Sequence, residues 1–154
     1  MELKVRKARK SDSNGILQLI IELAKFEKLE PPNEKAKRRL LKHAFGKNRS
    51  FYVLLLESDN KIIGYAFYFF TYSSFLARKT LYLEDIFITG EKRRSGAGKV
   101  LMEKLLKIAG KEKCGRMEWC VLDWNKNAIN FYDKLGAKPL KDWIYYRIDL
   151  RNSK

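Results

Sequence analysis

The chain has 154 residues, of which 45% are hydrophobic and 33% are charged. This length suits one domain spanning residues 1–154, and this hydrophobic fraction excludes a disordered chain. No apolar run approaches the ~20 residues that a membrane span needs. The first residues, MELKVRKARKSD, contain no apolar signal region, so we expect a cytoplasmic protein that does not bind membranes.

The charge balance is strongly basic. Lysine and arginine number 33 against 18 aspartate and glutamate residues, which gives a net charge of +15. Such a charge favours polyanions, such as a nucleic acid or a phosphorylated cofactor. It is equally typical of a lysine-rich solvated surface, and we favour that second interpretation because the basic clusters are interleaved with apolar residues.

Cysteine and histidine are too few for a metal site. Cys114 and Cys120 do not have the spacing of a metal-binding pair, and His43 is the one histidine. We therefore predict no metal and two reduced cysteines.

The first part of the chain predicts a strand followed by two helices. Apolar and charged residues alternate from Leu3 to Lys7, which is typical of a strand. Ser11 or Ser13 is expected to cap the first helix. The second helix runs from about Asn33 to Phe45 and ends at Gly46. The first helix shows its apolar face at helical spacing: Ile16, Leu19, Ile20, Leu23 and Phe26.

Three strands are predicted next. SFYVLLLES and IIGYAFYFFTY are joined by the turn SDNK (58–61), which is typical of a hairpin. TLYLEDIFIT is rich in β-branched and aromatic residues and predicts another strand.

The last part of the chain alternates helices and strands. A long helix has Ala97, Leu101, Leu105 and Ile108 on one face, and MEWCVLDW predicts a strand. Asn125 can cap a helix at 126–135 that Gly136 ends, and DWIYYRIDL predicts a closing strand. Antiparallel hairpins come before a parallel crossover, so we predict an α/β fold with a mixed, mostly antiparallel sheet and helices packed on it.

The stretch EKRRSGAGKVL (91–101) resembles a phosphate-binding loop. The loop of nucleotide triphosphatases is excluded because Arg93 replaces its first glycine and Val100 replaces its Ser or Thr. The dinucleotide fingerprint is excluded because Leu101 replaces its third glycine.

The remaining interpretation is Arg-x-x-Gly-x-Gly between a strand and a helix. Its glycines let backbone N–H groups converge on an anion, and the helix start adds its positive dipole end. A helix-capping turn with basic neighbours is the structural alternative. The segment consists of Arg93, Arg94, Ser95, Gly96, Ala97, Gly98 and Lys99.

This loop resembles the pyrophosphate loop of the GNAT acetyltransferases. The resemblance implies acetyl-CoA as cosubstrate and a sheet that splays into a V at its fourth strand. The segments ELAKFEKLE, FYFFTY, LYLEDIFI and LDWNKNAINFYDKLGA are similar to those of the spermidine/spermine acetyltransferase subfamily, which includes thialysine acetyltransferases. The resemblance also implies a homodimer.

The resemblance implies roles for the catalytic residues. Glu84 is expected to accept the amine proton through water, and Asp85 to help hold a cationic substrate. Strand alternation sends these two side chains to opposite faces unless a bulge intervenes. Tyr132 is expected to donate a proton to the CoA thiolate. Paired structural carboxylates and a packed helix aromatic are the alternatives.

Further residues are assigned by the same resemblance. Phe26 and Glu27 are expected to line the amine site, with Trp143 at its border. Ile86, Phe87 and Ile88 are expected to place their backbone along the cofactor. Asn125 and Asn130 are expected to contact the cofactor, although Asn125 also fits a simple helix cap.

The net charge bears on the substrate. A basic protein slows encounter with polyamines and speeds encounter with polyanionic CoA. LYLEDIFITGE carries three acids and no base, so the acceptor site is acidic locally. We predict an amine N-acetyltransferase acting on a small polyamine or thialysine. A protein amine as the acceptor, or a nucleic-acid-binding protein without turnover, is the alternative.

Overall fold

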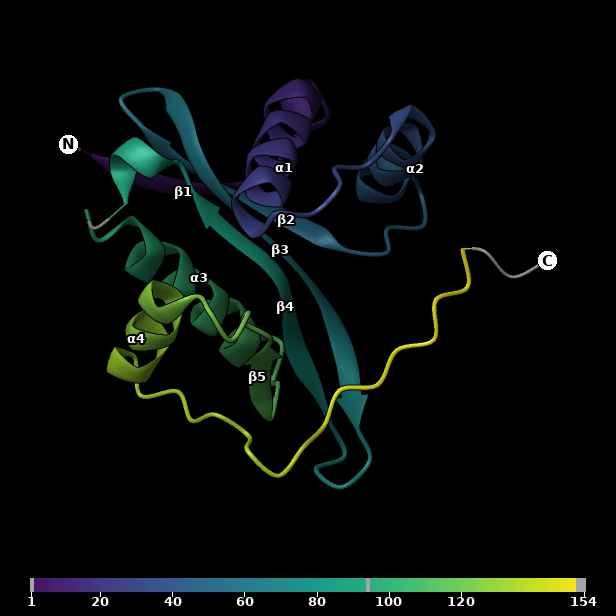
Figure 1. Ribbon diagram of the computed structural model, residues 1–154, viewed down its shortest axis with the longest axis vertical. Helices are drawn as coiled ribbons and strands as arrows, with labels where there is room; N and C mark the ends of the chain where they lie inside the picture. The colour runs from purple at the N-terminus through teal and green to yellow at the C-terminus, as the bar shows by residue number, and fades with distance from the viewer. Residues whose placement is uncertain (1, 94, 152–154) are drawn as a thin grey trace. The chain divides into compact units, whose positions relative to one another are not determined.

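The computed structural model describes residues 2–93 and 95–151. Two compact units make up the chain, Met1–Cys120 and Val121–Lys154. The first unit holds the sheet and three long helices (Figure 1).

The sheet of the first unit has five strands in the order β1-β2-β3-β4-β5. The first four pair antiparallel, and β5 pairs parallel to β4. The mixed, mostly antiparallel sheet that the sequence predicts is therefore confirmed. The strands are β1 (Leu3–Lys7), β2 (Tyr52–Ser58), β3 (Lys61–Ser73), β4 (Arg78–Ile88) and β5 (Arg116–Trp119).

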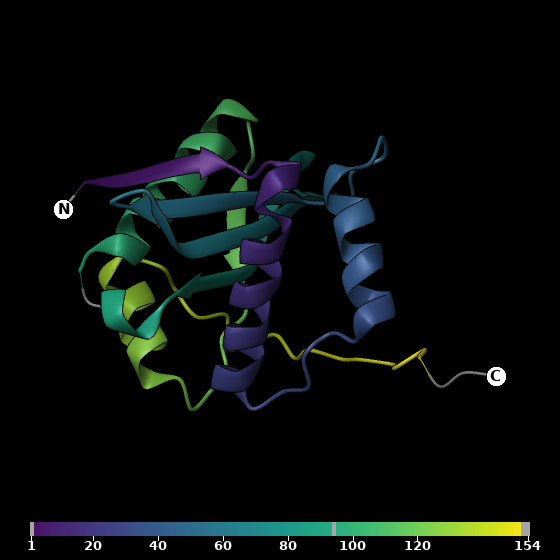
Figure 2. The same cartoon turned by 90° about the horizontal axis from the view of Figure 1, so that it is seen from above.

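Helices cover both faces of this sheet. Helices α1 (Ser13–Glu27) and α2 (Glu34–Phe45) lie on one side, and α3 (Ala97–Lys111) lies on the other (Figures 1 and 2). The apolar stripes of the helices meet alternate residues of the strands, as a two-faced core requires. On the α1 side the core includes Ile16, Leu19, Leu23, Ala44, Phe51, Val53, Leu55, Tyr65 and Phe87.

The start of α1 differs from the prediction. Neither Ser11 nor Ser13 caps the helix: Asp12 is the N-cap residue, and Ser13 is already helical. The reason is an ion pair, because Asp12 accepts two hydrogen bonds from Arg6 of β1, at 2.8 and 2.9 Å. Arg6 also donates to Glu57 of β2 at 2.7 Å. This guanidinium therefore joins two strands to the helix start, and it holds the pKa of Asp12 below its usual value.

The other boundaries follow local chemistry. The Asn33 side chain accepts from the Ala36 N–H at 2.9 Å, which caps α2, and Gly46 ends it. Asp59 and Asn60 take positive φ values of 50° and 62°, as the predicted hairpin turn requires. Strand β5 is shorter than predicted and ends at Trp119.

The second unit holds helix α4 (Lys126–Lys134) and an extended tail. The Asn125 side chain accepts from the Ala128 N–H at 3.2 Å, and Gly136 (φ 83°) follows the helix end, so both predicted boundary signals are confirmed. The predicted closing strand at 142–150 is wrong: no residue from 137 to 150 is in a strand. Its side chains lie exposed, since a strand forms only against a partner edge and none pairs with it within the described chain.

Candidate functional site

A break in register between β3 and β4 shapes the site. Phe67 pairs with Asp85, whereas the next residue, Tyr68, pairs with Leu83. Glu84 is therefore the extra residue of a β-bulge, which bends the strand and changes the direction of its side chain. The bulge cancels the strict alternation that would place Glu84 and Asp85 on opposite faces.

Three carboxylates gather around this bulge. Asp85 is half-buried, and Glu27, the last residue of α1, reaches it from the helix. Glu27 and Glu84 are both close enough to Asp85 to disfavour its ionisation. The structure thus brings together the three acidic residues that the sequence assigns to the amine site.

The environment makes these carboxylates weaker acids. Burial raises the pKa of Asp85 to about 6, repulsion from Glu84 adds to the rise, and a hydrogen bond from Tyr65 opposes it. Burial also raises the pKa of Glu27. Carboxylates that repel each other gain most when a cation approaches. Within the described residues, no ion pair involves Glu27, Glu84 or Asp85.

Beyond the bulge, β4 keeps a free edge. Pairing with β5 covers residues 80–83 and ends at Leu83. Residues 86–88 pair with β3 on the other side, at Ala66, Tyr65 and Gly64. On the β5 side, no described strand partners them. Alternate backbone N–H groups of Ile86–Ile88 therefore have no ladder partner there.

The glycine loop leads from β4 into α3. Gly96 is the N-cap residue of α3 with φ +83°, a conformation that glycine adopts without strain. A Cβ at this position would meet nothing within 4 Å, so the space beside it is open. The N–H groups of Ala97, Gly98 and Lys99 lie in the first helical turn, where no acceptor exists inside the helix. These features fit an anion such as a pyrophosphate.

Cations flank the loop. Arg93 donates from Nε to the Ile88 carbonyl oxygen at 3.0 Å. Its guanidinium also lies 4.4 Å from the ring centroid of Phe26 and 5.3 Å from that of Phe87. This arginine therefore ties the end of α1, and with it the amine site, to the loop.

The remaining loop positions have separate outcomes. Lys99 lies 3.9 Å from Glu103 on the exposed side of α3. Ser95 donates to the Lys92 carbonyl oxygen at 2.7 Å, which supports the turn. Arg94 lies outside the described residues.

The other predicted site residues belong to the second unit. Tyr132 of α4 is buried, Asn130 is exposed, and Trp143 lies in the tail with 77% of its surface exposed. Asn125 serves as a helix cap, so that part of the expectation holds, and its contact with a cofactor stays a prediction. The approach of these side chains to the carboxylates also stays a prediction.

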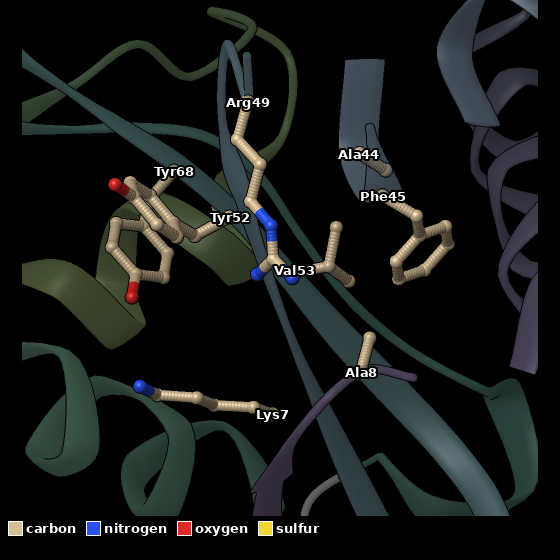
Figure 3. A pocket seen from close by; sticks show the side chains of 8 residues that line it. All are labelled: Lys7, Ala8, Ala44, Phe45, Arg49, Tyr52, Val53 and Tyr68. Carbon is tan, nitrogen blue, oxygen red and sulfur yellow. The ribbon is translucent and has the colours of Figure 1, made fainter. Parts of the chain in front are cut away.

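A pocket of the first unit lies near β2 and α2 and has a different character (Figure 3). Its volume of about 20 Å³ has room for about one water molecule. None of its eight lining side chains is acidic, and Lys7 and Arg49 make it basic. We therefore do not assign the amine to it. The lining residues are Lys7, Ala8, Ala44, Phe45, Arg49, Tyr52, Val53 and Tyr68.

Sequence reasoning missed Tyr65. This residue of β3 is fully buried in the α1-side core, and its hydroxyl donates to Asp85 Oδ2 at 3.2 Å. Burial and the nearby carboxylates raise the pKa of this phenol. No signal in the sequence marks it, because a tyrosine in an aromatic strand looks like core.

The fold as a whole resembles solved acetyltransferase structures. An integron cassette protein from the mobile metagenome of V. cholerae superposes with a TM-score of 0.83 over 97% of this chain and 93% of that chain, at 24% identity. This likeness concerns the fold. With the loop at the start of α3 and the acidic bulge of β4, it points to the acyltransferase class of enzymes.

The family follows from the sequence. Residues 17–137 match the acetyltransferase (GNAT) family, and the chain belongs to that family. It is 34% identical to thialysine N-epsilon-acetyltransferase of Mus musculus, over 95% of this chain and 92% of that protein. It is also 34% identical to spermidine/spermine N(1)-acetyltransferase-like protein 1 of Homo sapiens, over 95% of this chain and 22% of that protein.

Membrane spans and metal sites were also considered. Among the helices of residues 2–93 and 95–151, none is both long and apolar enough to cross a membrane. The same residues contain no group of three His, Cys, Asp or Glu side chains suited to a metal ion.

Replacing the half-buried carboxylate should change the pH dependence of stability. Because the folded-state pKa of Asp85 lies above its ordinary value of 3.8, folding favours the protonated form. Its cost is absent near pH 4 and grows as the pH rises through about 6. Asp85→Asn should therefore stabilise the fold by about 1–2 kcal/mol at pH 7.5 and by little near pH 4.

Urea unfolding of both proteins from pH 4 to 8 measures this difference. The matched control is Asp123→Asn, a substitution at an exposed position. A stability difference for Asp85→Asn that stays constant across this range would contradict the assignment.

Proposed function

We propose that this enzyme transfers the acetyl group of acetyl-CoA to a primary amine of a small polyamine or thialysine. The observation that carries the proposal is the gathering of three carboxylates without an ion-pair partner among the described residues, beside the free edge of β4. An ammonium group is the natural ligand of such a site. The anion-binding geometry of the loop at Gly96 supports a CoA pyrophosphate.

Each step of a direct transfer has a candidate group in this chain. Acetyl-CoA supplies a thioester, whose C–S bond breaks as the N–C bond forms in a ternary complex. Glu84, exposed at the bulge, accepts the amine proton through water, while Asp85 and Glu27 hold the positive charge. Backbone N–H groups of Ile86–Ile88 polarise the carbonyl oxygen. Tyr132 donates a proton to the departing thiolate.

Similar proteins support the choice of acceptor. The relatives named above bear the names of thialysine and spermidine/spermine acetyltransferases. These acceptors share a primary amine that is protonated in solution and suits an acidic site. Local charge decides binding here, since exposed charges beyond ~8 Å are largely screened at physiological salt.

The loop assignment predicts a selective loss of cofactor binding. Gly96→Asp places a side chain and a negative charge in the open space beside the α3 start. We expect the Kd for CoA, measured by calorimetry, to rise by about tenfold or more. Gly90→Asp makes the same charge change at a position that is also open, and should change the Kd by about twofold at most. Equal effects of the two substitutions would contradict the assignment.

The acceptor is tested with an amine panel and acetyl-CoA, following thiol release. We expect turnover with at least one of spermidine, spermine, putrescine, thialysine, lysine and a basic peptide. Glu84→Gln should lower kcat by about 100-fold because the proton acceptor is lost. Glu112→Gln, which removes an exposed carboxylate paired with Lys79 at 3.0 Å, should leave kcat unchanged.

The panel also separates the alternatives. Equal rates for Glu84→Gln and the unmodified enzyme would refute the role of this residue as proton acceptor. Turnover of the peptide alone would indicate a protein amine as acceptor. Absence of turnover, together with salt-dependent binding of mixed DNA or RNA, would favour the nucleic-acid-binding alternative that the net charge of +15 suggests.

We also propose that two chains form a homodimer through their tails. The tail exposes six large apolar side chains, each more than 70% exposed. They occupy both faces of the segment, so a strand formed there would need cover on each side. Strand β5 of a second copy offers an edge, because the described part of the sheet ends at β5. The exposed side chains are Trp143, Ile144, Tyr145, Tyr146, Ile148 and Leu150.

A charge in the tail should dissociate this dimer. Ile148→Asp alters a side chain that is 87% exposed in the single chain, so the fold of one chain should be unaffected. Light scattering after size exclusion should give twice the mass of one chain for the unmodified protein and a single mass for the variant. Lys138→Asp, in the same tail before the apolar residues, should stay dimeric. A dimer that persists in Ile148→Asp would refute the tail interface.

A further inference from the structure

The buried hydroxyl of Tyr65 lies in the amine site, and this inference rests on the proposed function. Tyr65 is fully buried, and its ring is part of the α1-side core. A phenylalanine would fill the same volume, so packing alone does not require the oxygen. A buried hydroxyl is costly without a hydrogen-bond partner. Its acceptor here is the carboxylate of Asp85, at 3.2 Å.

The strand register explains how the two side chains meet. Tyr65 pairs with Phe87, and Asp85 pairs with Phe67. Tyr65 and Asp85 are therefore diagonal neighbours on one face of the sheet, a separation that an aromatic side chain can span. The bulge follows directly at Glu84, so the hydrogen bond holds the last regular residue before the strand direction changes.

We propose that Tyr65 is a positioning residue of the amine site: its hydroxyl holds the Asp85 carboxylate ionised and oriented toward the acceptor ammonium. The need for such a group follows from the charges around Asp85. Glu84 from the same strand and Glu27 from α1 both repel its negative charge. The nearby cation is Arg93, whose guanidinium lies on the rings of Phe26 and Phe87. Without a donor, Asp85 would retain its proton near neutral pH and lose its attraction for the ammonium.

The 3.2 Å distance also bears on substrate binding. Hydrogen bonds between hydroxyls and carboxylates are commonly 2.5–3.0 Å long, about 0.2 Å or more below this value. An ammonium bound to Asp85 removes the remaining tendency of this carboxylate to protonate. Tyr65 thus selects the charged state that binds the acceptor, without contacting the acceptor itself.

The test compares Tyr65→Phe with Tyr68→Phe. Tyr68 lies on the same strand and is also buried, but at the opposite face, where its ring stacks 5.4 Å from that of Tyr52. Each change deletes one buried hydroxyl, and thermal melting confirms that each variant folds. The substrate is the fastest amine of the panel, assayed from pH 5.5 to 8.5.

We expect Tyr65→Phe to raise the amine KM about threefold to tenfold at pH 6 and by little at pH 8.5. The acid limb of kcat/KM should move upward by about half to one pH unit. The KM for acetyl-CoA should stay within about twofold, as a site-specific role requires. In an Asp85→Asn background, Tyr65→Phe should have no further effect on the amine KM. Tyr68→Phe should match the unmodified enzyme throughout.

Carbon-13 NMR of the aspartate carboxyl groups gives a readout that needs no turnover. The Asp85 signal, assigned by its loss in Asp85→Asn, should titrate at higher pH in Tyr65→Phe than in the unmodified protein. In the unmodified protein, added amine should shift the same titration to lower pH. This second measurement tests the role of Asp85 even if Tyr65→Phe fails to fold.

Overlapping pH profiles of Tyr65→Phe and the unmodified enzyme, with an unchanged Asp85 titration, would overturn the inference. Equal changes in Tyr65→Phe and Tyr68→Phe would also overturn it, because they would indicate a general packing effect. Failure of the proposed function looks different: no amine would be acetylated, while the Tyr65-dependent titration of Asp85 would persist.

Discussion

The one-residue shift between β3 and β4 is the constraint on which the site depends. Without it, Glu84 and Asp85 would point to opposite faces of the sheet, one toward α1 and one toward α3. The bulge allows both carboxylates to act on one region, where Glu27 of α1 joins them. A strand that carries two adjacent acids within an aromatic sequence is costly, and the site geometry gives that cost a purpose.

The same strand loses its second neighbour at the same place. Pairing with β5 stops at Leu83, one residue before the bulge. Beyond it, β4 keeps β3 on one side and offers unpaired backbone groups on the other. The end of β5 and the bulge therefore act together: the first frees N–H groups, and the second places acids beside them. Arg93 then connects this region to the glycine loop through the rings of Phe26 and Phe87.

Local signals in the sequence predicted most of the fold, because caps, turns and apolar periodicity are local properties. Asn33, Asn125 and the Asp59–Asn60 turn lie where such signals place them. The start of α1 was wrong because Asp12 is held by Arg6 from a distant part of the sheet. The closing strand at 142–150 was wrong because a strand requires a partner edge, which its own residues do not specify.

Within the site, the sequence predicted which acids gather but not how they are held. A bulge leaves no local signal, so the relation between Glu84 and Asp85 stayed open until the β3–β4 register was known. Tyr65 was hidden for a different reason, since its ring belongs to the core and its hydroxyl to the site. A residue with two roles follows the pattern of the more common one, and here that is packing.

The net charge of +15 and the acidic site are compatible because they act at different distances. The exposed lysines and arginines set the long-range field, which salt screens beyond ~8 Å. Asp85 and Glu27 are partly buried, where screening is weaker and desolvation strengthens each interaction. A basic surface attracts the anionic cosubstrate, and the buried acids then select a cation at the reacting end. The location of the acids in the fold, more than their number in the chain, therefore determines which acceptor the enzyme can bind.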